Sequence, residues 1–198
     1  KTRMFGGDQV EVRLVGDYFD ATLLAAKEFC TAQGAHFLSP FDDEDVIEGQ
    51  ASVSVEIAQQ LGDMPDHIIL PVGGGGLSSG TVSYFGKDCG YTFVEPSGAR
   101  SLAEAVAAGA PVDVSPINSF VDGAAVAKIG DRTFARLRDV AVGDVIDLQE
   151  DRICGTIVEM LNVEGIVLEP AGALAIEALD EVADRIIGKT VVCGASGG

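Results

Sequence analysis

The chain has 198 residues, of which 31 are acidic and 13 are basic, so its formal net charge at pH 7 is −18. This charge opposes binding to nucleic acid and to anionic lipid, so a phosphate ligand would have to be held by local dipoles. No stretch approaches the roughly 20 apolar residues that span a bilayer, and we expect a soluble, cytoplasmic protein. The four cysteines lack the paired spacing of a zinc or redox motif, which predicts reduced thiols.

The first 61 residues predict a strand followed by two helices. Apolar residues alternate with polar ones over residues 10–15, the pattern of an edge strand with one buried face. Asp20 is expected to cap an alanine-rich helix, with Phe19 packing as a hydrophobic staple and Gly34 ending the helix. Helical apolar spacing then predicts one helix over residues 45–61.

The middle of the chain alternates strands with helices. Residues 67–72 form a short apolar run, typical of a parallel strand covered on both faces, and this run leads directly into four consecutive glycines. Residues 77–85 are predicted to form the helix after the glycines. A second strand is expected over residues 91–95 and an alanine-rich helix over residues 101–108.

The remaining third continues the alternation. Asp131 is expected to cap a helix that runs through Val140, and further elements are predicted as a strand over residues 145–148 and a helix over residues 153–161. Pro170 suits the first position of another helix, and residues 190–193 predict a last strand. The whole pattern predicts an α/β fold with a mostly parallel sheet and helices on both faces, which binds ligands at the carboxyl ends of its strands.

The four glycines that follow the apolar run are the most informative feature of the sequence. Glycine has no Cβ and tolerates positive φ, so the amides of Gly73, Gly74, Gly75 and Gly76 can approach a ligand closely. The N-terminus of the following helix favours a phosphate through its free N–H groups and its dipole. No Lys-Ser or Lys-Thr pair follows, and no third glycine stands at dinucleotide spacing. The alternative is a turn that only lets a helix pack close to the sheet.

At this point the sequence resembles a known family. Pro71-Val72-Gly73-Gly74-Gly75-Gly76-Leu77 is similar to the phosphate loop of the serine and threonine dehydratase family of pyridoxal-phosphate enzymes, which have the tryptophan synthase β-like fold, also called fold type II. Further segments resemble family landmarks in the same order: Gly49-Gln50, Glu95-Pro96, residues 120–126, Ile129-Gly130-Asp131, residues 169–173 and Ser196-Gly197-Gly198.

The resemblance implies that the amides of Gly73, Gly74, Gly75, Gly76 and Leu77 hold the phosphate of pyridoxal 5'-phosphate. It also implies that the Ser196 hydroxyl meets the pyridine nitrogen, with the Cys193 thiol as a competitor. A neutral hydroxyl leaves the pyridine a weaker electron sink than a carboxylate would, which suits β-elimination. The alternative for Ser196 is a small residue that closes a turn.

Four further positions resemble functional positions of the family less specifically. Gly123 resembles a backbone position beside the cofactor, although a tight turn explains it equally well. Glu169 resembles an acid near the ring edge, but a carboxylate before a helix that starts with proline is also favourable by itself. Glu95 and Ala99 resemble cation ligands of related racemases and dehydratases. Because the further acidic ligand would fall on Ser101, we predict no metal site.

The lysine that forms the Schiff base in this family has no counterpart here. None of the five lysines has the expected Ser-Phe-Lys-x-Arg-Gly surroundings, and each is expected on the surface: Lys1, Lys27, Lys87, Lys128 and Lys189. The resemblance therefore implies a part of a longer enzyme, with residues 1–40 from a smaller N-terminal domain and residues 41–198 from the large cofactor-binding domain. The 198 residues alone should be inactive.

The whole enzyme is expected to convert L-threonine to 2-oxobutanoate and ammonia, as a homodimer or homotetramer that acts on a small amino acid. Two alternatives stay open. One is an L-serine dehydratase or serine racemase, which shares the loop. The other belongs to a different class, a non-catalytic module that binds a phosphate or a cofactor.

Overall fold

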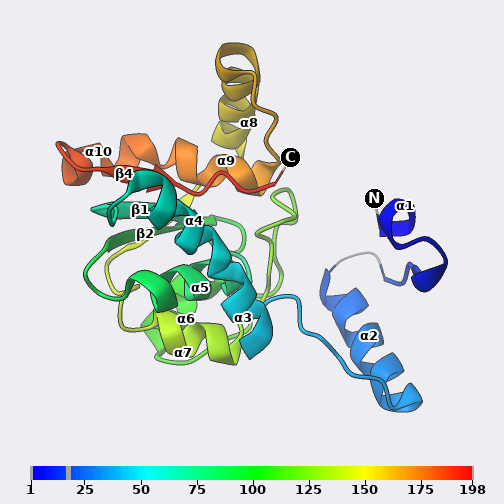
Figure 1. Ribbon diagram of the computed structural model, residues 1–198. Helices are drawn as coiled ribbons and strands as arrows, with labels where there is room; N and C mark the ends of the chain where they lie inside the picture. The colour runs from blue at the N-terminus through cyan, green and yellow to red at the C-terminus, as the bar shows by residue number, and fades with distance from the viewer. Residues whose placement is uncertain (1, 17–18, 198) are drawn as a thin grey trace. The chain divides into compact units, whose positions relative to one another are not determined.

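The computed structural model describes residues 2–16 and 19–197 (Figure 1). The chain divides into two compact units, Lys1–Leu38 and Ser39–Gly198. The first unit contains α1 (Thr2–Gly6), a 3-10 turn η1 (Gly7–Gln9) and α2 (Phe19–Gln33). As predicted, α2 ends at Gly34, whose φ is +63°. No helix within these described ranges has the length and apolar character needed to cross a membrane.

The strand predicted over residues 10–15 is wrong. This segment has no regular secondary structure, and Val10, Leu14 and Val15 are exposed by 40%, 86% and 51%. Alternating residues favour an extended backbone, but a strand also needs a hydrogen-bonded neighbour, and the described part of the first unit contains no other strand. The predicted cap, Asp20, falls inside α2, and its side chain lies outside the described residues.

The second unit is built on a four-stranded sheet in the order β3-β2-β1-β4. The strands are β1 (His67–Pro71), β2 (Gly90–Pro96), β3 (Val145–Leu148) and β4 (Val191–Cys193), and every pair is parallel. The apolar sequence of β1 follows from its place, because it is buried along its whole length between β2 and β4. The predicted parallel sheet is confirmed.

Five helices lie on the side of the sheet where Ile68, Leu70 and Phe93 are buried; four of them contribute to this hydrophobic core, and the first packs against the third. They are α3 (Glu44–Gln50), α4 (Ser52–Leu61), α5 (Gly76–Phe85), α6 (Ser101–Ala108) and α7 (Asp131–Leu137). The single helix predicted over residues 45–61 is divided at Ala51. A Cβ on Gly80 would lie 2.7 Å from the Ala51 nitrogen, so α5 packs directly against the junction of α3 and α4.

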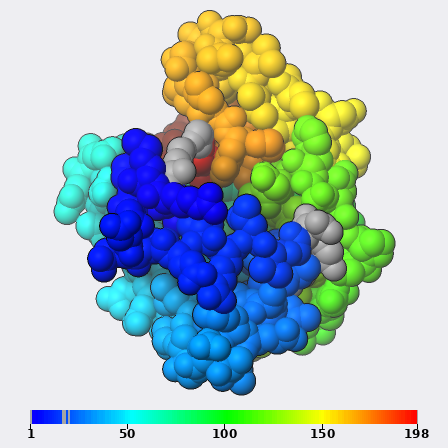
Figure 2. All heavy atoms as spheres, turned by 90° about the vertical axis from the view of Figure 1, so that its right-hand side faces the viewer, coloured from blue at the N-terminus to red at the C-terminus, as the bar shows by residue number. Residues whose placement is uncertain are grey.

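The opposite face buries Ile69 and Val94 against a second set of helices. These are α8 (Glu150–Glu159) with the π-helical turn η2 (Met160–Glu164), α9 (Pro170–Glu177) and α10 (Leu179–Ile186). Pro170 is the first residue of α9, as predicted. The segment formed by α8 and η2, yellow to gold, projects from the rest of the unit in both views (Figures 1 and 2). Helices therefore cover both faces, which confirms the predicted fold class.

The start of α7 differs from the prediction. Asp131 is the first residue of the helix and makes no capping hydrogen bond, and the helix ends at Leu137 instead of Val140. The capping carboxylate is Asp42, whose Oδ1 accepts hydrogen bonds from the N–H groups of Arg132 at 2.8 Å and Thr133 at 3.2 Å. A cap that comes from about 90 residues away leaves no local sequence signal.

His67 links the two central strands inside the core. The residue is 4% exposed, and its Nε2 lies 2.9 Å from the Thr92 hydroxyl on β2. Burial lowers the pKa of the imidazole, and the positive charges of Lys189 and Arg185 lower it further, while Asp144 acts in the opposite direction. The folded state therefore holds this side chain neutral.

Acidification should destabilise the fold through His67. Because the folded-state pKa lies below the ordinary value of 6.5, the unfolded chain takes up a proton first, and the contribution of His67 to the free energy of unfolding should fall as the pH drops through about 6.5. Glu95, whose pKa is raised to about 7, contributes with the opposite sign. Replacing His67→Gln should remove the contribution of His67 from the pH dependence, whereas His36→Gln, at an exposed position, should leave that contribution in place. Urea unfolding between about pH 5 and pH 8 measures this. Equal slopes for the parent and His67→Gln would contradict a neutral, buried imidazole.

Candidate functional site

Two glycine-rich segments meet at one edge of the sheet. Residues 73–76 follow β1, and residues 194–197 follow β4, which lies next to β1 and runs parallel to it. The N–H of Gly194 donates to the Ile69 carbonyl at 2.8 Å, which holds the second segment against β1. As predicted, both segments lie at the carboxyl ends of strands, where α/β folds bind their ligands.

In residues 73–77, which we call the phosphate loop, the backbone N–H groups and the carbonyls differ in their hydrogen bonding. Within the described part of the chain, none of the five N–H groups of residues 73–77 donates a hydrogen bond to another group of the protein. The Gly73 and Gly74 carbonyls accept hydrogen bonds from the hydroxyls of Ser101, at 3.3 Å, and Thr133, at 2.8 Å. A row of donors without protein partners is suited to an anionic ligand.

Several positions of the loop require glycine, either because a Cβ would clash with a neighbouring group or because φ is positive. A Cβ on Gly74 would overlap the Phe41 ring, and a Cβ on Gly73 would lie 3.0 Å from the Ala124 Cα. Gly75 has a φ of +87°, in the left-handed region. Close packing, the alternative interpretation of the glycines, thus explains part of the sequence. A helix start ordinarily leaves the amides of Gly75, Gly76 and Leu77 without intrahelical partners, but neither the helix start nor close packing explains the unpartnered amides of Gly73 and Gly74.

The other predicted cofactor residues lie in a connected series around this edge. A Cβ on Gly123 would lie 3.3 Å from Oε1 of Glu169, and the Gly123 carbonyl lies beside Gly73. The Glu169 carboxylate lies beside Gly197, whose carbonyl accepts a hydrogen bond from the Glu169 N–H at 3.5 Å. The structure therefore brings together four segments that lie about 30 to 50 residues apart in the sequence. The roles of these residues toward a cofactor stay predictions.

A mostly apolar cavity of about 360 Å³ adjoins the start of α5. Leu77 and Ser196 both line this cavity, together with Cys193 and apolar side chains of α4, β1 and β4. Burial raises the pKa of the Cys193 thiol, which keeps that group protonated near neutral pH. Ser196 and Cys193, the two predicted partners of a pyridine nitrogen, thus share one cavity.

Glu95 caps a helix, a role that was not predicted. The side chain is fully buried, and its two carboxylate oxygens accept hydrogen bonds from the N–H groups of Leu102 at 2.7 Å and Ala103 at 2.9 Å. Burial raises the pKa of Glu95 to about 7, although the two backbone hydrogen bonds oppose the rise. The Ser101 hydroxyl lies 3.4 Å from Oε1. Among the described residues, no group of three or more His, Cys, Asp or Glu side chains is arranged to hold a metal ion.

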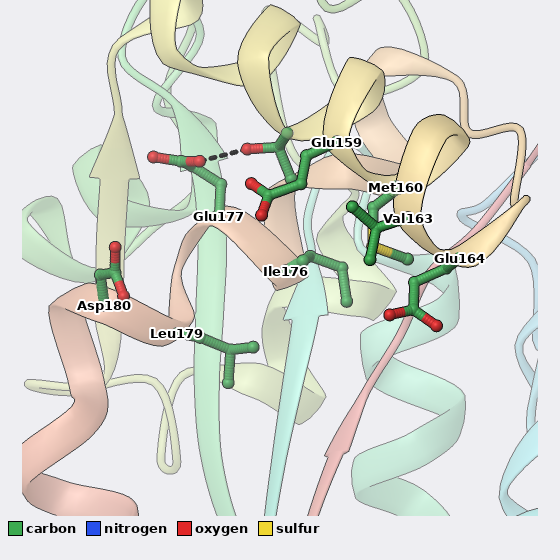
Figure 3. A pocket seen from close by; sticks show the side chains of 9 residues that line it. Glu159, Met160, Val163, Glu164, Ile176, Glu177, Leu179 and Asp180 are labelled. Atoms are coloured by element: carbon green, nitrogen blue, oxygen red, sulfur yellow. Dashed lines mark hydrogen bonds between the residues drawn. The ribbon is translucent and has the colours of Figure 1, made fainter.

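A second cavity, of about 250 Å³, lies between the α8–η2 segment and the region where α9 meets α10 (Figure 3). Its lining combines apolar side chains with the carboxylates of Glu159, Glu164, Glu177 and Asp180. The Thr156 hydroxyl donates to Glu177, as the dashed line in Figure 3 marks. None of the predicted cofactor residues lines this cavity.

The four lysines that the structure describes lie at the surface. Lys27, Lys87, Lys128 and Lys189 are all exposed, and Lys1 lies outside the described residues. Lys87 pairs with Asp139 at 4.0 Å, and the Lys27 ammonium lies 5.7 Å from the centre of the Phe37 ring. These four side chains have the solvated surroundings that were predicted.

The sequence pattern of the family described as pyridoxal-phosphate dependent enzyme matches residues 1–197. The chain belongs to this family. The match extends over both compact units and includes the phosphate loop and the segment that contains Ser196. A pyridoxal-phosphate dependent enzyme needs a phosphate site, and the unpartnered amides of residues 73–77 fit that need.

Similar proteins of the family include curated enzymes and solved structures. The biosynthetic L-threonine dehydratase of Bacillus subtilis is 43% identical over 201 residues, which cover 100% of this chain and 47% of that protein. The processed form of threonine deaminase isoform 2 from Solanum lycopersicum has a TM-score of 0.86 and 33% identity, covering 98% of this chain and 57% of that one. Maize serine racemase has a TM-score of 0.79 and 27% identity, covering 90% and 58%. The chain thus spans about half the length of the curated relatives it matches.

Substituting Gly75→Ala should weaken binding of pyridoxal phosphate. A left-handed φ costs an L-residue about 1–2 kcal/mol, and the new Cβ would lie 3.0 Å from the Thr133 Cβ, so the loop must shift. Gly109→Ala is the matched control, because Gly109 has a φ of +73° and a Cβ there would meet nothing within 4 Å. Both variants should lose stability through the left-handed φ, with a further loss from crowding in Gly75→Ala, but only Gly75→Ala should lose affinity, by about tenfold. Equal affinities in a cofactor titration would contradict the assignment.

Proposed function

We propose that the chain is the cofactor-binding part of a pyridoxal-phosphate dependent L-threonine dehydratase, which forms 2-oxobutanoate and ammonia in isoleucine biosynthesis. The observation that carries this proposal is the row of five N–H donors without protein partners in the phosphate loop. In a protein with a net charge of −18, such a row offers a phosphate dianion local positive potential.

The phosphate loop would hold the cofactor's phosphate through the amides of Gly73, Gly74, Gly75, Gly76 and Leu77. The ten-residue helix α5 begins at Gly76, so its dipole adds to these amides. A helix N-terminus stabilises an anion by about 0.3–2 kcal/mol. Hydrogen bonds from N–H groups to a charged oxygen are stronger than those between neutral groups. Together these contacts anchor the phosphate without basic side chains.

The residues around the loop would orient the rest of the cofactor. In this proposal the Ser196 hydroxyl meets the pyridine nitrogen without placing a full charge on it. The backbone at Gly123 lies beside the ring, and Glu169 lies near the ring edge. When bound, pyridoxal phosphate supplies an electron sink for negative charge at the Cα of an amino acid. We assign the lysine amine that takes the Cα proton to a part of the protein outside these 198 residues, and residues 1–40 to a smaller domain.

Threonine is the substrate we favour over serine. The support comes from the biosynthetic threonine dehydratases of Bacillus subtilis and Lactococcus lactis, which are 43% and 41% identical to the chain along its full length. Maize serine racemase, at 27% identity, represents the competing serine-specific enzymes. A non-catalytic cofactor-binding module is the alternative of another class, since the chain alone contains the phosphate loop but not the lysine motif.

We further propose a homodimer or homotetramer in the cytoplasm. The α8–η2 segment and the loop after it expose apolar side chains close together, which suits a contact between subunits. Val158, Leu161, Val163, Ile166 and Val167 are exposed by 46% to 70%.

The protein expressed from its complete reading frame should convert threonine to 2-oxobutanoate in the presence of pyridoxal phosphate, with a higher kcat/KM than for serine. The 198-residue chain alone, assayed under the same conditions, should form none, because it lacks the lysine motif. Product formation is measured directly for each amino acid.

Each other outcome of this assay identifies an alternative. Detectable 2-oxobutanoate from the chain alone would refute the assignment of the lysine to another part of the protein. A preference for serine would favour a serine dehydratase, and interconversion of the serine enantiomers a racemase. Cofactor binding without turnover of either amino acid would favour the non-catalytic module.

A further inference from the structure

Thr133 connects the phosphate loop to a helix that is distant in the sequence. Its side chain is fully buried in the first turn of α7, and its hydroxyl lies 2.8 Å from the Gly74 carbonyl oxygen and 3.1 Å from that of Gly130. A hydroxyl has one proton to donate, and the shorter distance favours Gly74. This contact spans 59 residues of sequence.

The position of Thr133 is fixed from two directions. Asp42 accepts the Thr133 N–H at 3.2 Å, which anchors the start of α7. The Thr133 carbonyl accepts a hydrogen bond from the Ser79 hydroxyl at 3.1 Å, and Ser79 lies on α5, the helix that follows the loop. Thr133 therefore forms hydrogen bonds both with the phosphate loop and with α5, the helix that follows the loop.

Ion pairs at the surface also hold α7 against the segment of residues 41–44, which contains Asp42. Arg132 pairs with Glu44 at 3.5 Å, and Arg136 also pairs with Glu44. Phe41, which precedes the capping aspartate, lies against Gly74 and Gly76. Residues 41–44 thus contact both α7 and the loop.

The direction of one carbonyl determines the direction of the next amide. The peptide group is planar and trans, so its C=O and N–H point to opposite sides. A hydrogen bond from Thr133 to the Gly74 carbonyl therefore turns the Gly75 N–H away from α7. Ser101 acts on the preceding peptide in the same way, but its distance to the Gly73 carbonyl is longer, 3.3 Å.

We propose that Thr133 is a positioning residue for the cofactor's phosphate: its hydroxyl holds the Gly74–Gly75 peptide so that the Gly75 N–H faces the ligand. Thr133 does not touch the ligand in this arrangement. The inference rests on the proposed function, because it concerns the same phosphate loop. It adds a side chain remote in sequence that selects the orientation of the loop.

The test compares affinities for pyridoxal phosphate and for pyridoxal, which lacks the phosphate, in the protein expressed from its complete reading frame. Thr133→Ser and Thr133→Ala form a matched pair, since both lose the methyl group and only the second loses the hydroxyl. Thr133→Val preserves the shape. We expect Thr133→Ala and Thr133→Val to bind pyridoxal phosphate about tenfold more weakly, the size of one positioned hydrogen bond, and pyridoxal unchanged. Thr133→Ser should stay within about twofold of the parent.

Two controls separate positioning from a general loss of stability. Thr92→Val removes another buried hydroxyl, one that lies 2.9 Å from His67 Nε2, and it should leave the ratio of the two affinities unchanged. The ³¹P chemical shift of the bound cofactor should move in Thr133→Ala and not in Thr133→Ser. A structural defect alone would weaken both ligands equally, and that result would overturn the inference. If Thr133→Val does not fold, the serine and alanine pair still decides the question.

The outcomes also distinguish this inference from the proposed function. If the parent protein shows no preference for pyridoxal phosphate over pyridoxal, the phosphate loop assignment itself fails. If the parent shows the preference and Thr133→Ala retains it with the same ³¹P shift, only the role of Thr133 is refuted.

Discussion

The peptide groups of the phosphate loop are held from one side only, and the proposed activity depends on this asymmetry. Hydroxyls of Ser101 and Thr133 hold the Gly73 and Gly74 carbonyls, while the N–H groups of residues 73–77 have no partner in the described part of the protein. Because the peptide group is planar, fixing the carbonyls also directs the amides. In the proposed phosphate site the donors are thereby oriented before a ligand arrives, which reduces the ordering needed on binding.

The same arrangement is compatible with the proposed binding of a phosphate by an acidic protein. Glu95 and Asp42 are the carboxylates that anchor the two helices behind the loop, and each accepts hydrogen bonds from backbone N–H groups at a helix start. The N–H groups at the start of α7 compensate the charge of Asp42, and those at the start of α6 compensate the ionised fraction of Glu95, whose pKa of about 7 leaves it partly protonated near neutral pH. Carboxylates near a phosphate would otherwise oppose its binding. In the second unit, Glu95 and Asp42 instead hold the starts of α6 and α7, the helices that carry the hydroxyls of Ser101 and Thr133.

Local sequence patterns predicted what depends on local structure. The strand that leads into the four glycines, the helix over residues 101–108 and the position of Pro170 at a helix start agree with the structure. The alternation over residues 10–15 was misleading because a strand also requires a neighbouring strand. The Asp42 cap and the Thr133 contact could not be predicted, since each joins segments about 60 to 90 residues apart. Within the candidate site, the sequence predicted the row of glycines, but not the side chains of Asp42, Ser101 and Thr133 that hold the loop and the helices behind it.

Amide hydrogen exchange tests most directly whether the free N–H groups of the phosphate loop bind the phosphate. In the protein from the complete reading frame, amides of residues 73–77 should exchange rapidly without ligand, since they lack protein partners. Pyridoxal phosphate should slow this exchange, and pyridoxal should not. Rapid exchange in both the free and the cofactor-bound protein, with protection confined to another segment, would contradict the account.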